Sequence, residues 1–359
     1  MLLNKPKILY IGKFDLRNSS LGYCFDNYPT NIMFRYGSNR EIPVTHMDYC
    51  FIVDMEYVSF SSVTEVNSWD TYDIIILGQA GFVPPDVYEL VSNVSHGRLI
   101  IAPDIAPQNY SNMKDIGIIL PVRYNKTISA TAKGILHYNE LCSRWFGTCC
   151  NIPFYTINYP VNTKYWKKFF VERSSKVSRV LLGSSNFCGW QNCYSSYMAA
   201  MRIANGEMCV ATIARSYMAE GKEWDFLWDE LAESYGNILH LSPGGCYESY
   251  YVGEVSKSLI AVNLYRDPSP MRFALQCAMV GTPLICASGT DASRLFPMTT
   301  VHEFDLVKAV EIGKRLVNDH SFYNSVVSYA FDEVEWWSYE ASLHRFYNML
   351  PILMEWVRS

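Results

Sequence analysis

The sequence lacks the features that would place it in a membrane, in a metal-binding class or outside the cell. Its 359 residues contain no run of about 18 apolar residues, so no transmembrane helix is expected. The 11 cysteines form no CxxC pair or zinc-spaced His/Cys cluster, and no DxD follows a strand, so we expect no metal site. The first apolar run is too short for a signal sequence. An odd cysteine count then favours free thiols in a reducing, cytoplasmic compartment.

There is also no excess of positive charge, no internal repeat and no low-complexity tract. The net charge of −5 creates no general attraction for nucleic acid or anionic membranes, although a local basic patch is compatible with it. The apolar fraction of 49% and the charged fraction of 18% are typical of a globular protein. At roughly 150 residues for each domain, the length predicts two domains.

Short apolar runs alternate with longer amphipathic stretches, a pattern typical of parallel sheets with crossover helices. The strands expected in the first part are residues 7–11, 73–77, 98–102 and 118–121, with an apolar segment at 154–159. The helices expected there are residues 21–35, 89–94 and 133–146. Residues 174–176 are interpreted as a linker, after which the pattern starts again.

In the second part the same alternation predicts a second sheet. The expected strands are residues 179–182, 208–213, 237–241, 259–264 and 283–286. The expected helices are residues 194–203, 224–235, 247–256, 270–280, 305–318, 320–331 and 333–356. We therefore predict an α/β protein of two Rossmann-like domains facing each other across a cleft, with ligands at the carboxyl ends of the strands.

The sequence at residues 257–264 (KSLIAVNL) and 269–285 (SPMRFALQCAMVGTPLI) resembles the strand, polar loop, helix and returning strand of GT-B glycosyltransferases, in particular the C-terminal domain of groups 1 and 4. Residues 160–163 (PVNT) resemble the hinge of that family. The resemblance covers about residues 155–350. It implies an acceptor domain at 1–165, a donor domain at 166–335, and a last helix, 336–359, that packs back on the first domain.

The resemblance also implies a site for a nucleoside diphosphate sugar. A helix N-terminus and arginine side chains can bind the diphosphate, and a polar side chain can bind the ribose hydroxyls. The candidate donor-binding residues are Gly12, Ser184, Ser185, Asn186, Arg215, Lys222, Gly245, Arg266, Arg272, Phe273 and Gln276. GT-B enzymes need no bound metal for the diphosphate, so we expect neither a metal nor a cofactor other than the sugar donor.

Two positions depart from the family pattern. Retaining members carry two glutamates eight residues apart, and the matching positions here are Pro268 and Gln276. The stereochemistry therefore stays open. Asp104 follows an apolar strand of the first domain and could act as the general base of an inverting transfer, and Asp15 is the second candidate. Both acids also fit ordinary turn or helix-capping roles.

The main hypothesis is an enzyme, a hexosyltransferase-like glycosyltransferase that uses a UDP- or GDP-sugar and a hydroxyl acceptor. The nearly neutral first part suits a glycan or small hydroxylated acceptor. A DNA-modifying enzyme acting on a hydroxymethylated base is an alternative that would need a basic, aromatic groove. Two further alternatives are a sugar-nucleotide 2-epimerase and a non-catalytic nucleotide-sugar-binding module. The sequence does not predict an oligomeric state.

Overall fold

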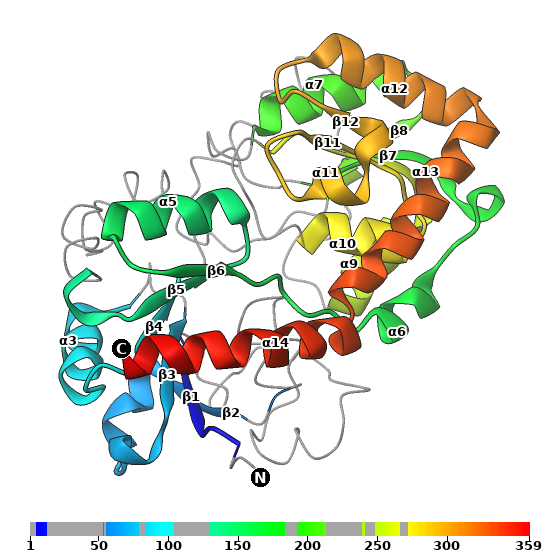
Figure 1. The fold of residues 1–359 in the computed structure, drawn as a ribbon. Coiled ribbons are helices and arrows are strands. Elements are labelled where there is room, and N and C mark those ends of the chain that lie inside the picture. Colours follow the sequence, from blue (N-terminus) through cyan, green and yellow to red (C-terminus); the bar gives the residue numbers. More distant parts are fainter. Residues whose placement is uncertain are drawn as a thin grey trace. The chain divides into compact units, whose positions relative to one another are not determined.

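The structure is a computed structural model that describes residues 5–12, 53, 55–78, 83–103, 129–183, 192–212, 239–240, 248–265 and 272–359. The chain divides into two compact units (Figure 1). The first comprises Met1–Val161 and Trp337–Ser359, and the second comprises Asn162–Trp336. The chain therefore crosses between the units twice. Each unit contains one parallel sheet with helices, so the protein is an α/β protein.

The first unit holds a six-stranded sheet in the order β2-β1-β3-β4-β5-β6, and every strand pair is parallel. Its strands are β1 (Ile8–Gly12), β2 (Met55–Ser59), β3 (Ile74–Gly78), β4 (Leu99–Ala102), β5 (Gly134–His137) and β6 (Phe154–Thr156). Its helices are η2 (Phe60–Glu65), η3 (Trp69–Thr71), α3 (Pro85–Val94), α5 (Glu140–Cys150) and α14 (Tyr339–Arg358). The central strands β1, β3 and β4 are buried along their whole length, because helices cover both faces of the sheet.

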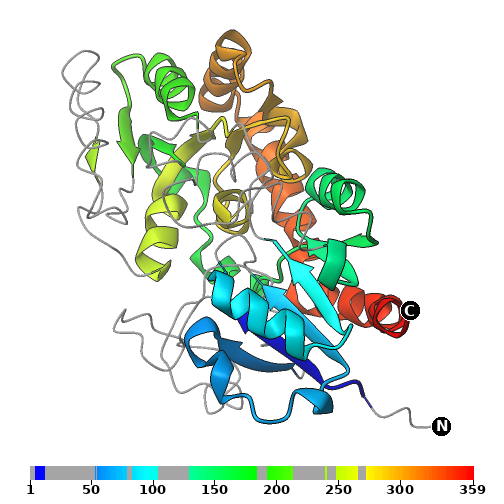
Figure 2. The same cartoon turned by 90° about the vertical axis from the view of Figure 1, so that its left-hand side faces the viewer.

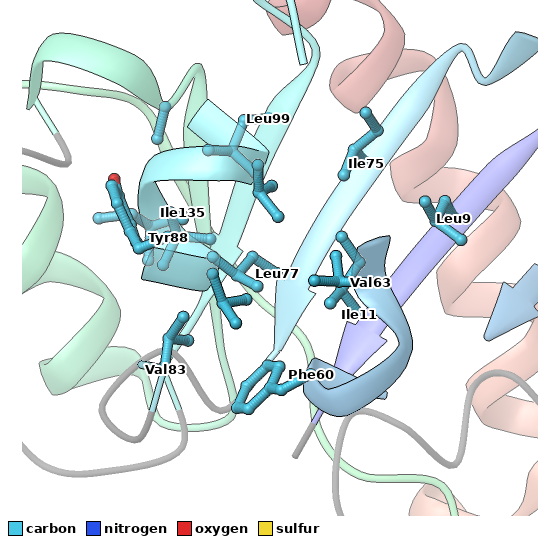
Figure 3. Packing of buried hydrophobic residues seen from close by; sticks show 14 of the residues in the cluster. Leu9, Ile11, Phe60, Val63, Ile75, Leu77, Val83, Tyr88, Leu99 and Ile135 are labelled. Atoms are coloured by element: carbon cyan, nitrogen blue, oxygen red, sulfur yellow. The ribbon is translucent and has the colours of Figure 1, made fainter. Parts of the chain in front are cut away.

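Alternate residues of these strands build two separate cores, since successive side chains of a strand point to opposite faces. On one face, Leu9, Ile75 and Leu99 pack with α3, α5 and η2 (Figure 3). On the other face, Ile8 and Ile74 pack with α14. Figure 2 shows α3 and α14 on opposite sides of this sheet.

The last helix, α14, belongs to the first unit although the chain reaches it from the second. Its buried side chains Phe346, Met349 and Leu353 join the core with Ile8 and Ile74. The ring of Trp356 lies over Gly134 of β5, where a Cβ atom would collide with it. The C-terminal helix thus crosses back to the first unit, as the resemblance implied.

The second unit holds a six-stranded sheet in the order β12-β11-β10-β7-β8-β9, again with every pair parallel. Its strands are β7 (Val177–Leu182), β8 (Cys209–Thr212), β9 (Leu239–His240), β10 (Ser258–Asn263), β11 (Leu284–Ala287) and β12 (Thr300–Val301). Its longer helices are α7 (Cys193–Ala204), α9 (Glu248–Lys257), α10 (Arg272–Met279), α12 (Leu306–Asn318) and α13 (His320–Glu333). Its shorter helices are α6 (Thr163–Trp166), η7 (Lys167–Phe169), η8 (Arg173–Ser175), α11 (Ala292–Leu295), η9 (Pro297–Thr299) and η10 (Val334–Trp337), of which η10 spans the boundary between the units.

The helices of this unit form two layers. The connection from β7 to β8 and the connection from β10 to β11 run in opposite directions across the sheet. Right-handed crossovers therefore place α7 on one face and α10 on the other. Helix α12 packs on α7, and α9 and α13 pack on α10.

A buried ion pair joins β7 to α9 at the end of the sheet where β7 begins. Arg179 Nη1 lies 3.1 Å from Glu254 Oε2, and the two side chains are 6% and 10% exposed. Arg179 also donates to the Ser258 hydroxyl at 3.0 Å and to the Glu254 carbonyl oxygen at 2.8 Å, and Lys257 lies 2.8 Å from the same carboxylate. Burial alone would raise the pKa of Glu254, but the bonds from Lys257 and Arg179 outweigh it and lower this pKa.

Two expectations about local structure were wrong. Residues 133–146 are not one helix but strand β5 followed by α5, because Asn139 caps the helix by accepting from Cys142 N–H at 3.1 Å. Residues 174–176 are not an interdomain linker. Lys176 is a half-buried side chain that donates to Ser256 O at 2.5 Å and Thr282 Oγ1 at 3.0 Å, inside the second unit. Strand β2 was not predicted, and the expected elements at 21–35, 118–121 and 224–235 lie outside the described residues.

Candidate functional site

The strand order of the second unit places its candidate site between β7 and β10. From β7 the chain proceeds to β8 and β9 on one side, and from β10 to β11 and β12 on the other. The order reverses between these two neighbouring strands, and open parallel sheets bind ligands outside the carboxyl ends of the strands at such a point. Leu182 and Val262 form the last pair of these two strands there. We call this end of β7 and β10 the donor edge.

Gly183 lies at the donor edge, directly after β7. Its N–H donates to Val262 O at 3.0 Å. A Cβ atom on Gly183 would collide with the ring of Phe273 and lie 3.0 Å from Asn263 Cβ. Phe273, a predicted donor-site residue, therefore packs on the residue that immediately precedes the predicted donor residue Ser184. The absence of a side chain at Gly183 lets the first turn of α10 approach the sheet closely.

Helix α10 carries two further described members of the predicted donor set. Arg272 and Gln276 are four residues apart and so lie on the same face of the helix. Arg272 is half-buried and Gln276 is buried. Cys277, next along the helix, is fully buried, and burial raises its thiol pKa well above the ordinary value, so it stays a neutral core residue. The helix thus presents a guanidinium and an amide from one face.

A residue that the sequence did not single out ties together the connections that follow three strands of this sheet. Asn192 precedes α7, and its Nδ2 donates to Leu264 O at 2.9 Å and to Glu303 O at 2.8 Å. Leu264 follows β10, and Glu303 follows β12. In turn, Leu264 N–H donates to the Ser196 hydroxyl at 2.9 Å. No sequence motif marks Asn192, because its partners are more than seventy residues away along the chain.

The remaining calls for the second unit, and both catalytic calls, lie outside the described residues. These are Ser184, Ser185, Asn186, Arg215, Lys222, Gly245 and Arg266 for the donor, and Asp15 and Asp104 for catalysis. They stay predictions from the sequence. Their neighbours in the chain are placed, however. Gly183 and Asn192 flank residues 184–191, and Tyr265 and Arg272 flank residues 266–271.

The first unit has a reversal of strand order of its own, between β1 and β3. Gly12, the remaining predicted donor residue, is the last residue of β1, and Gly78 is the last residue of β3. A Cβ atom on Gly12 would lie 2.8 Å from the hydroxyl oxygen of Tyr57, and one on Gly78 would collide with the ring of Tyr10. Both glycines therefore have a packing reason to be there, and Gly78 is a residue of this edge that the sequence analysis did not select.

A buried histidine ends strand β5 of the same sheet. The side chain of this residue, His137, is fully buried. Its Nδ1 accepts from Asn139 N–H at 3.0 Å, which assigns the ring proton of the neutral form to Nε2. The ring lies beside those of Tyr138 and Phe146, with centroids 4.2 and 5.8 Å away. His137 thus lies at the carboxyl end of the sheet, held in one orientation.

The part of the chain that the structure describes contains neither a cluster of metal-binding side chains nor a membrane-spanning helix. No three or more His, Cys, Asp or Glu side chains are grouped there so that they could hold a metal ion. Among the same residues, no helix is long and apolar enough to span a membrane.

No protein-family model matches the chain, and no curated protein sequence is similar to it. Solved structures are similar over nearly the whole chain. The N-terminal domain of Candida albicans trehalose-6-phosphate phosphatase is 10% identical, with a TM-score of 0.63 covering 99% of this chain and 98% of that one. A UDP-forming α,α-trehalose-phosphate synthase from Burkholderia xenovorans is 9% identical, with a TM-score of 0.63 covering 99% and 100%. Anabaena HepE in complex with UDP-glucose is 10% identical, with a TM-score of 0.64 covering 97% and 100%.

These likenesses establish the fold. Two parallel α/β sheets in this order along the chain are what the resemblance to GT-B glycosyltransferases predicted, and the fold of two Rossmann-like units is confirmed. At about a tenth of identical residues, the solved structures say nothing of individual side chains in this chain.

Proposed function

We propose that the chain is a glycosyltransferase that moves a sugar from a nucleoside diphosphate sugar, UDP- or GDP-linked, to a hydroxyl group of an acceptor. The observation that carries the proposal is the donor edge, where Phe273 brings the first turn of α10 onto Gly183 at the reversal of strand order. Two solved structures of the same fold support it, because one is named a UDP-forming synthase and the other holds UDP-glucose.

The proposed chemistry places the donor on the second unit and the acceptor on the first. In the transfer, the bond between the anomeric carbon and the diphosphate oxygen breaks, and a bond to the acceptor oxygen forms. The departing diphosphate gains negative charge. The N-terminal end of α10 and the guanidinium of Arg272 supply partial and full positive charge, without a metal ion. An arginine in the first turn of a helix is unfavourable unless an anion is bound nearby, which supports this role for Arg272.

The proton of the acceptor hydroxyl needs a base. We propose Asp104 for this role in an inverting transfer, with Asp15 as the second choice. Gln276 replaces a carboxylate at the position proposed for the ribose hydroxyls, where an amide can both donate and accept. For the compartment we propose the cytoplasm, because an odd cysteine count favours free thiols in a reducing compartment.

The test is turnover of donor sugars by the purified chain. UDP-glucose, other UDP-sugars and GDP-sugars are incubated with the protein, and release of the nucleoside diphosphate is measured with and without EDTA. We expect release from at least one donor, unaffected by EDTA. Asp104→Asn should lower kcat by about 100-fold or more with little change in the donor Kd. Correctly folded protein that neither binds nor consumes any of these donors contradicts the proposal.

The same experiment separates the other candidate functions. A donor that stabilises the protein, by about 2.7 kcal/mol at roughly 100 times its Kd, without being consumed indicates a binding module. Conversion of the donor sugar to its 2-epimer, without loss of the nucleotide, indicates an epimerase. Transfer to a glycan or small hydroxylated acceptor supports the proposed acceptor class. Salt-dependent binding of hydroxymethylated DNA in a gel shift would favour a DNA acceptor.

A further inference from the structure

Asn192 adopts a backbone conformation that few residues other than glycine adopt. Its φ of 47° and ψ of 42° place it in the left-handed region, directly before α7. Asparagine tolerates this region better than most side chains do, yet the conformation still has a cost. Such conformations persist where surrounding contacts hold them, and they concentrate at functional sites.

The contacts that hold Asn192 use the full donor capacity of its amide. An asparagine amide has two N–H groups, and here they donate to Leu264 O at 2.9 Å and to Glu303 O at 2.8 Å. The backbone of Asn192 is held as well, because the Ser196 hydroxyl donates to its carbonyl oxygen at 3.2 Å. That same hydroxyl accepts from Leu264 N–H at 2.9 Å. Leu264 is therefore fixed through both its N–H and its C=O.

These bonds connect the ends of three strands. Asn192 closes the connection from β7, Leu264 opens the connection from β10 to α10, and Glu303 lies in the connection from β12 to α12. The first two leave the sheet on either side of the donor edge. The predicted donor residues Ser184–Asn186 and Arg266 belong to these two connections. The hydrogen bonds of Asn192 and Leu264 therefore hold one described residue next to each of these two predicted donor segments.

We propose that Asn192 is a positioning residue of the nucleotide-sugar site. Its amide holds Leu264, directly after β10, against the start of α7, so that the end of β10 at the donor edge is fixed before the nucleotide binds. This rests on the proposed function. Binding is stronger when the site is ordered in advance, because less conformational entropy is then lost on binding.

Two substitutions remove the amide in different ways. Asn192→Asp keeps the size of the side chain but replaces N–H donors with a carboxylate oxygen facing two carbonyl oxygens. Asn192→Gly suits the positive φ better than asparagine and simply deletes the side chain. A matched control exists at the other end of the same helix. Asn205 follows α7 with a φ of 48°, is exposed, and lies away from the donor edge.

The experiment measures the Kd of UDP and of GDP by calorimetry on the full chain, with circular dichroism and thermal unfolding as fold controls. Asn192→Asp and Asn192→Gly should each weaken the preferred nucleotide about tenfold, as expected for the loss of one or two hydrogen bonds, and Asn205→Asp should not. In donor turnover, KM should rise by a similar factor while kcat changes by less than about threefold.

Three results would overturn this role. If the folded Asn192 variants bind the nucleotide within about twofold of the unchanged chain, the residue is only structural, and the proposed function stands. A lowered melting temperature with an unchanged Kd leads to the same conclusion. If the unchanged chain binds neither nucleotide, the positioning role and the proposed function both fall.

Discussion

Gly183 shows, at the scale of one residue, how packing and the candidate site depend on each other. It does not have a positive φ, so alanine would fit its backbone. The conflict is with its surroundings, because the added Cβ would collide with the Phe273 ring. Gly183→Ala should therefore displace the first turn of α10, lower the free energy of unfolding by about 1–3 kcal/mol, and weaken nucleotide binding. Thermal unfolding and calorimetry with UDP check both effects.

A second glycine in the same unit provides the control. Gly253 lies within α9, and nothing is within 4 Å of the position that a Cβ would occupy. Gly253→Ala should stabilise the helix by about 0.5–1 kcal/mol and leave the Kd unchanged. In a Phe273→Ala background, Gly183→Ala should cost little further stability, because the ring that the added Cβ would meet is gone. If Gly183→Ala alone leaves both stability and binding unchanged, Phe273 does not depend on Gly183 for its position.

Residues of the site differed in how far the sequence could reveal them. Arg272, Phe273 and Gln276 were selected because residues 269–285 resemble a continuous GT-B motif, and the structure places all three on α10. Asn192 could not be found in this way. Its role depends on β7 and β10 being neighbours in the sheet, and the order of strands is set by long-range packing.

At the scale of elements, the joint between β7 and α9 depends on the buried pair Arg179–Glu254. Replacing one partner leaves the other charge buried without compensation, which typically costs about 3–5 kcal/mol. Glu254→Gln keeps the shape of the side chain and one acceptor oxygen. We therefore expect the free energy of unfolding at pH 7 to fall by about 3 kcal/mol, near the lower end of this range. Chemical denaturation measures it. Glu311→Gln, which breaks the exposed pair with Lys308, should change stability by less than about 0.5 kcal/mol.

The Arg179–Glu254 pair also predicts how the stability difference between the unchanged chain and Glu254→Gln depends on pH. The pKa of Glu254 is lower in the folded chain than its ordinary value of 4.5, so the folded state binds fewer protons than the unfolded state. The stabilisation contributed by ionised Glu254 is complete above the pKa that this residue has in the unfolded chain. It is lost as the pH falls through the pKa that Glu254 has in the folded chain. The gap between the unchanged chain and Glu254→Gln should therefore narrow below about pH 4.5. A gap that stays constant down to pH 3 would contradict the ion pair.

The strands of the first unit that are uninterrupted apolar runs were predicted from the sequence, whereas β2 and β5, which lack a long apolar run, were missed. ILYI in β1 and IIIL in β3 are buried on both faces and therefore read as continuous apolar runs. Strand β2 (MEYVS) has exposed Glu56 within it and lies at the edge of the sheet, so it shows no such run. In β5 the apolar run is only three residues long, and the helix that follows obscured it.

At the scale of the whole molecule, helix α14 makes the first unit dependent on the end of the sequence described here. Leu353 is fully buried against the strands of that unit. Leu353→Ala should lower the stability of the first unit by about 2–5 kcal/mol. Hydrogen exchange read by mass spectrometry should show faster exchange in β1 and β3 and little change in β10 and β11. Tyr347→Ala, an exposed position on the same helix, is the control and should have little effect.

Equally faster hydrogen exchange in both units would show that the two units do not unfold separately. Unchanged exchange in both units would show that the first core does not depend on Leu353. A selective effect would show that residues 337–359 are part of the first core rather than an attached tail. In that case the crossings at Val161–Asn162 and Trp336–Trp337 mark the true limits of the two units.

These two crossings also have a consequence for the order in which the chain can fold during translation. The second unit occupies one continuous stretch, Asn162–Trp336, so all of its sheet has been made before α14 exists. The first unit is interrupted by that stretch, and one face of β1, β3 and β4 has no helix α14 to cover it until residues 337–359 follow. The part of the chain that is synthesised first is therefore the part that finishes folding last.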